Sequence, residues 1–134
     1  MIAAVRPNEA YHADARAGLQ VLAERGAELV VPSIILPELA SALARQGAAE
    51  TDVENLLDTL DTLPGGRLVP VDEHVAQRSA RLALQLRLRG CDAVYVALAH
   101  LVGATLISLD DEQRSRIPTG VTALTPSEML VRLT

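Results

Sequence analysis

The chain has no lysine, phenylalanine or tryptophan, and its aromatic residues are two tyrosines. Because its hydrophobic content is nevertheless 49%, a folded core must be built from Ala, Val, Leu and Ile. The single cysteine, Cys91, excludes an internal disulfide and a zinc site made of cysteine pairs. The net charge of -5 is not that of a protein that only coats nucleic acid, although it permits a nucleic-acid enzyme whose acidic groups gather at a metal site.

The sequence also lacks an apolar run long enough to cross a membrane. Residues 93–109 come nearest, but a spanning helix needs roughly 20 apolar residues, and His100 and Gly103 interrupt this run. Residues 6–9 interrupt the apolar start too early for a signal peptide. We therefore expect a cytoplasmic protein without membrane contact. Its 134 residues are typical of a single domain, which we expect to span residues 1–134.

Short apolar runs that are typical of strands alternate with helical patterns along the chain. Strands are expected at residues 28–31, 68–71, 105–109 and 121–124, and helices at about 9–25, 34–45, 51–60, 72–89 and 92–102. Residues 51–54 resemble a capping box, and residues 125–128 open a terminal helix with Pro126 near its first position. The alternation predicts an α/β fold, a three-layer α/β/α sandwich with a mostly parallel sheet.

Three carboxylates stand out because they lie alone in apolar surroundings, where an isolated charge is costly. Asp92 opens a long apolar helix, Asp110 follows the strand at 105–109, and Glu38 lies in the first turn of another helix. Sites in open parallel sheets form beyond the carboxyl ends of the strands, so one edge could gather all three. Mg²⁺ or Mn²⁺ would relieve their mutual repulsion, because both ions prefer oxygen ligands. Such an ion can also activate a water molecule and offset charge on a phosphate.

Each of these acids has an ordinary structural interpretation as well. Asp92 could be only a helix N-cap, Asp110 a turn residue, and Glu38 a first-turn acid favoured by the helix dipole. We interpret Asp72 as a helix cap and Tyr95 as a packing residue near the site. None of the three histidines is spaced from an acid or cysteine as metal ligands are. Four arginines could contact RNA or a protein partner, although a solvated helix face is the commoner role: Arg78, Arg81, Arg87 and Arg89.

Three segments, taken in order, resemble one known family. They are LPEL at residues 36–39, DAVYVALA at 92–99 and TLISLD at 105–110. Together they resemble a PIN domain and, more narrowly, the VapC-type ribonuclease toxins of bacterial and archaeal toxin–antitoxin pairs. The resemblance extends over essentially the whole chain, and its second and third segments are the more specific ones.

This resemblance implies a metal-dependent endoribonuclease that hydrolyses RNA phosphodiester bonds. Transferred through the three motifs, Glu38, Asp92 and Asp110 are the catalytic acids that bind Mg²⁺ or Mn²⁺, and Asp111 or Glu112 could assist them. The family also implies a homodimer and inhibition by a small cognate antitoxin protein.

The chain departs from the family at its start. The family begins with a strand, central in the sheet, that ends in Asp and leads into an apolar run, and residues 1–4 correspond to that run. The resemblance therefore implies that the central N-terminal strand and its Asp are missing. Either the true start lies about 8–12 residues upstream, enough for a typical strand, or the chain is truncated.

Two other functions are weighed against the nuclease. The absent first Asp motivates a non-catalytic PIN-like module that binds an antitoxin or another partner. The upstream reading frame separates these two, because a strand ending in Asp there favours the enzyme. A receiver-type signalling domain shares the α/β alternation, but it would need a lysine near its last strand, and the chain has none.

Overall fold

The computed structural model describes residues 2–3, 21, 24–62 and 65–133, so the helix expected at about 9–25 lies mostly outside the described residues. Five strands form one sheet in the order β3-β2-β1-β4-β5, and every pairing is parallel. The strands are β1 (Ile2–Ala3), β2 (Leu29–Pro32), β3 (Gly66–Val69), β4 (Thr105–Ile107) and β5 (Ala123–Leu124).

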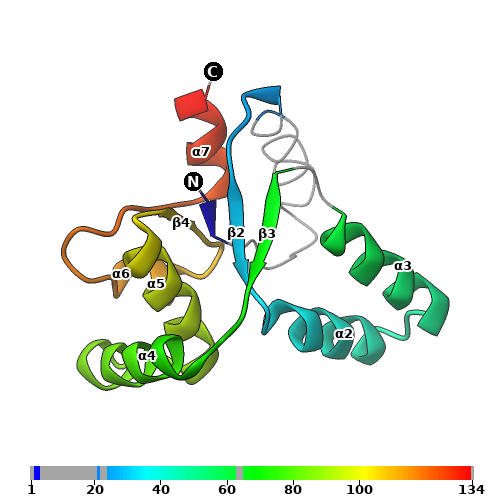
Figure 1. Ribbon diagram of the computed structural model, residues 1–134, viewed down its shortest axis with the longest axis horizontal. Helices are drawn as coiled ribbons and strands as arrows, with labels where there is room; N and C mark the ends of the chain where they lie inside the picture. The colour runs from blue at the N-terminus through cyan, green and yellow to red at the C-terminus, as the bar shows by residue number, and fades with distance from the viewer. Residues whose placement is uncertain (1, 4–20, 22–23, 63–64, 134) are drawn as a thin grey trace.

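Helices flank this sheet on both sides (Figure 1). They are α2 (Ile35–Arg45), α3 (Glu50–Asp61), α4 (Glu73–Leu86), α5 (Gly90–Val102), α6 (Asp111–Ser115) and α7 (Pro126–Leu133). In Figure 1, α4, α5 and α6 lie to the left of the strands, whereas α2 and α3 lie to the right. The expected α/β/α sandwich with a parallel sheet is confirmed.

The central strand of the sheet is β1, made of two residues at the start of the chain. Ile2 lies opposite Leu29 of β2 on one side and opposite Thr105 of β4 on the other. The expectation that this strand is missing is therefore wrong. Without β1, β2 and β4 would each present an unpaired inner edge, which sheets avoid. The second part of that expectation, that no Asp ends this strand, agrees with the sequence, in which the first acidic residue after β1 is Glu9.

Helix α5 forms the centre of the hydrophobic core. It packs against α4 and against strands β1, β2 and β4, and every residue from 92 to 99 is buried. Val96 and Ala97 are fully shielded from solvent. Because its apolar residues cover all sides, the helix can lie between two layers rather than at the surface. It ends at Val102, as expected, and its C-cap Gly103 adopts the left-handed conformation with φ of 66°, which glycine reaches without steric cost.

The strand at 105–109 is shorter than expected, and the difference positions the candidate site. Strand β4 ends at Ile107, and the chain then turns so that the Asp110 N–H donates to Ser108 Oγ at 3.0 Å. Asp110 becomes the N-cap of α6 instead of extending the sheet. None of the helices within the described ranges has the length and apolar character needed to cross a bilayer.

Candidate active site between helices α5 and α6

Asp92 lies in the first turn of α5, where the positive end of the helix dipole favours a carboxylate. It is 4% exposed, so its charge requires compensation. Its Oδ2 accepts a hydrogen bond from Arg89 Nε at 3.2 Å. The N-cap position of α5 belongs to Arg89, so the interpretation of Asp92 as a simple helix cap is wrong.

Asp110 reaches the same arginine from the other side. Its Oδ1 caps α6 by accepting the Gln113 N–H at 3.0 Å, which confirms an ordinary structural role. Its Oδ2 accepts from Arg89 Nη2 at 3.2 Å. Two acids from separate elements, the start of α5 and the turn after β4, therefore meet on one guanidinium.

Two buried polar residues that the sequence analysis missed hold this arrangement in place. Gln113 is 5% exposed and donates through Nε2 to the main-chain oxygen of Asp92 at 3.0 Å. Ser108 accepts the Asp110 N–H through its side chain, and its main-chain oxygen accepts from Arg114 Nη1 at 2.8 Å. The sequence does carry a signal for Gln113, because it stands three residues after Asp110, the spacing at which an N-cap residue is followed by a Glu or Gln in a capping box.

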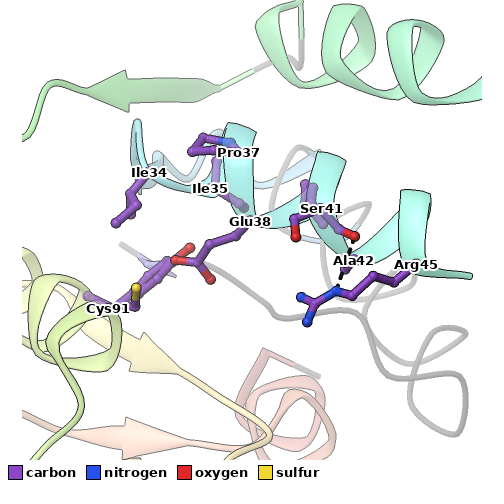
Figure 2. Close-up of a pocket in the computed structure, with 10 residues that line it drawn as sticks. Ile34, Ile35, Pro37, Glu38, Ser41, Ala42, Arg45 and Cys91 are labelled. Carbon is purple, nitrogen blue, oxygen red and sulfur yellow. Dashed lines mark hydrogen bonds between the residues drawn. The ribbon is translucent and has the colours of Figure 1, made fainter. Parts of the chain in front are cut away.

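Glu38 occupies the first turn of α2, as expected. It lines a pocket of about 500 Å³ together with residues of α2 and of α5. Figure 2 shows its carboxylate pointing from α2 toward Cys91 on α5. Cys91 and Tyr95, which also line this pocket, stand on either side of Asp92 in the α5 sequence. Glu38 therefore lies in the neighbourhood of the acidic pair without joining it.

The three acids do not form a ready-made cluster in this arrangement. Among the residues that the structure describes, no group of three or more His, Cys, Asp or Glu side chains is positioned to hold a metal ion. The structure brings Asp92 and Asp110 together through Arg89 and leaves Glu38 in the adjoining pocket. Asp111 and Glu112 pair with Arg114 and Arg116 respectively, within α6 and its C-cap.

The remaining candidates have structural surroundings. Asp72 is the N-cap of α4 and accepts the Val75 N–H at 2.9 Å, so its interpretation as a cap is confirmed. Tyr95 is 3% exposed and belongs to the core, which agrees with a packing role. Arg78 contacts His100 Nδ1 at 3.5 Å.

Comparison with known proteins identifies one family and several structures of similar fold. The model of the PIN domain family matches residues 1–117. Among curated proteins, no sequence matches this chain significantly. The structure is similar to PAE2754 from Pyrobaculum aerophilum, with a TM-score of 0.68 and 20% identity over 98% of this chain and 88% of that one.

Two further solved structures have a similar fold. One is the structure of VapBC2 from Rickettsia felis bound to a DNA fragment from its promoter. It gives a TM-score of 0.69 at 14% identity, covering 93% of this chain and 98% of that chain. A toxin–antitoxin complex from Klebsiella pneumoniae gives 0.55 at 21% identity, covering 74% of each chain. At these identities the likeness shows a shared fold.

Proposed function

Since this chain belongs to the PIN domain family, we propose that it is a metal-dependent endoribonuclease of the VapC type, acting as one PIN-like domain over residues 1–134. The observation that carries the proposal is the meeting of Asp92 and Asp110, from separate elements, on the single guanidinium of Arg89. Two carboxylates that share a cation in a largely buried position are suited to binding a divalent ion.

The donor set fits Mg²⁺ or Mn²⁺. The carboxylates of Asp92 and Asp110 supply hard oxygen ligands, and their shared contact with Arg89 shows that positive charge is accommodated between them. Glu38 would contribute the third carboxylate from the adjoining pocket. A divalent ion held by these residues would activate water and offset the charge of an RNA phosphate.

The chain's own residues would keep the two principal acids in position. Gln113 fixes the main chain of Asp92, and Ser108 fixes the main chain of Asp110. Because both supports are buried, the backbone that carries each acid is held in place before substrate arrives, and such outer-shell contacts help to orient metal ligands.

We further propose a small antitoxin protein as partner, a homodimer as the assembly, and the cytoplasm as the location. One solved structure of similar fold is described as a toxin–antitoxin complex and another as VapBC2, which supports the first of these. The second candidate function is a PIN-like module that binds a partner without catalysis. The absence of an acid in the residues directly after β1 favours it.

Cleavage of RNA by matched variants tests the nuclease. Asp92→Asn and Asp110→Asn should each lower the Mn²⁺-dependent cleavage rate by at least about 100-fold, because loss of a residue that merely orients a ligand already costs about 10–100-fold. Asp58→Asn is the control, since Asp58 is an exposed residue of α3 and its replacement removes the same charge away from the proposed site.

Undiminished cleavage by either of the first two variants would contradict the proposed site. An equal loss in the control would show that the effect does not come from the acidic pair. A wild-type protein that binds a partner tightly but cleaves no RNA in the presence of Mn²⁺ would favour the non-catalytic module.

A further inference from the structure

Arg89 joins the two carboxylates of the candidate site from the solvent side. Its Nε lies 3.2 Å from Asp92 Oδ2, and its Nη2 lies 3.2 Å from Asp110 Oδ2. The side chain of Arg89 is 69% exposed, whereas those of the two acids are 5% and 21% exposed. The guanidinium therefore lies over a pair of carboxylates that are otherwise largely enclosed by protein.

The two carboxylates need a cation to stay together. They are carried by different elements, and without compensation their like charges would drive them apart. A guanidinium donates from a planar fork and remains protonated at every physiological pH. It cannot release the acids by losing a proton, so it can leave them only if the side chain rotates away.

We propose that Arg89 is an internal counter-ion of this site, which holds Asp92 and Asp110 together in the metal-free protein and is displaced when a divalent cation binds. This inference rests on the proposed function, because it assumes that the same acids bind the metal. Mg²⁺ binds carboxylate oxygens at about 2.0–2.1 Å. A divalent ion held by both carboxylates would compete with the guanidinium for the oxygens that Arg89 now occupies, and the exposed arginine has solvent to turn into.

The proposed displacement of Arg89 by the metal distinguishes this counter-ion from an ordinary salt bridge, and the difference can be measured. If Arg89 leaves the acids when the ion arrives, its replacement weakens only the metal-free protein, and by linkage the ion binds the variant more tightly. An ordinary salt bridge that persists would stabilise both forms equally. Arg89 is a positioning residue in this view, and the readout does not depend on RNA cleavage.

The experiment compares thermal unfolding with and without saturating MnCl₂, together with calorimetric titration of Mn²⁺ alone into the full chain. The variants are Arg89→Gln and Arg89→Lys, with Arg87→Gln as the control. Arg87 lies two positions away and is exposed, so its replacement removes the same charge without touching the acids.

We expect Arg89→Gln to melt roughly 3–5 °C below wild type without metal and at the wild-type temperature with it. Mn²⁺ should bind this variant roughly tenfold more tightly, within the usual range of coupling between sites. Arg89→Lys, which keeps the charge but loses the fork, should give intermediate values, and it provides the test if the glutamine variant does not fold. The Arg87→Gln protein should match wild type in both measurements.

Three results would overturn the inference while leaving the nuclease proposal intact. The first is a melting temperature of Arg89→Gln that is lowered equally with and without Mn²⁺. The second is weaker Mn²⁺ binding by Arg89→Gln than by wild type. The third is the same gain in Mn²⁺ affinity for Arg87→Gln as for Arg89→Gln. If neither wild type nor any variant binds Mn²⁺, the proposed metal site fails and the inference fails with it. That outcome is distinct, because in the other three the wild-type protein binds the ion.

Discussion

Gln113 donates its side-chain amide to the main-chain oxygen of Asp92 across 3.0 Å, which ties helix α6 to the first turn of helix α5. The amide is buried, so the bond is shielded from competing water. The position of a proposed metal ligand thus depends on a residue that is not itself a candidate ligand.

Replacement of Gln113 by Ala should lower both stability and metal binding. We expect a loss of about 1–3 kcal/mol in the free energy of unfolding, because a buried hydrogen bond is removed and the shortened side chain leaves space. Urea denaturation measures this change. Gln77→Ala is the control, since the Gln77 amide is exposed and donates to the exposed Glu73 side chain, and it should stay within about 0.5 kcal/mol of wild type. Equal losses in the two variants would contradict a special role for Gln113.

Glu38→Gln tests whether the pocket acid joins the metal site. Affinity for a divalent ion depends on the number of charged ligands, so we expect Mn²⁺ to bind this variant about tenfold more weakly. Calorimetric titration supplies the measurement. Glu28→Gln removes an equivalent charge at an exposed pair with Arg67 and should leave the affinity unchanged. Wild-type affinity in Glu38→Gln would restrict the site to Asp92 and Asp110.

Arg87 adopts a left-handed conformation at the end of α4, with φ of 54°. Glycine reaches this conformation without steric cost, so Arg87→Gly should stabilise the protein by about 0.5–1 kcal/mol. The matched substitution Arg81→Gly lies inside the same helix and should instead cost about 1 kcal/mol. Thermal or urea unfolding compares the two, and a loss of stability at both positions would refute the conformational argument.

Ala97 is fully shielded from solvent on α5, the helix that packs against both the sheet and α4. Enlarging it to Leu should cost about 1–3 kcal/mol, because a close-packed core accommodates extra methyl groups only by displacing its neighbours. Ala80→Leu, at an exposed position of α4, should change stability by less than about 0.5 kcal/mol. If Ala97→Leu unfolds at the wild-type urea concentration, the region around α5 is less tightly packed than the structure indicates.

Local sequence patterns located most of the described elements, with mixed success at their ends. The last helix begins at Pro126, as expected, and there the Thr125 N–H donates to Glu128 and the Glu128 N–H donates back to Thr125 Oγ1. The similar pattern at 51–54 is misleading. Helix α3 begins at Glu50, and the Ala49 carbonyl accepts from Asp52 and Val53.

Features set by distant partners could not be found in this way. Strand β1 has two residues, too few to show any periodicity, and it exists because β2 and β4 flank it. Arg89 looks like one of several arginines on a helix face until the fold places Asp110 beside it. The acids could be proposed from motifs, whereas the cation that joins two of them required tertiary structure.

The chain carries one thiol, and it belongs to Cys91, an exposed residue at the rim of the pocket that contains Glu38. A maleimide fluorophore or nitroxide can therefore be attached beside the acidic residues of the native polypeptide, without removing competing cysteines. Arrival of an ion or an oligonucleotide would then be followed optically or by electron spin resonance in otherwise unaltered protein.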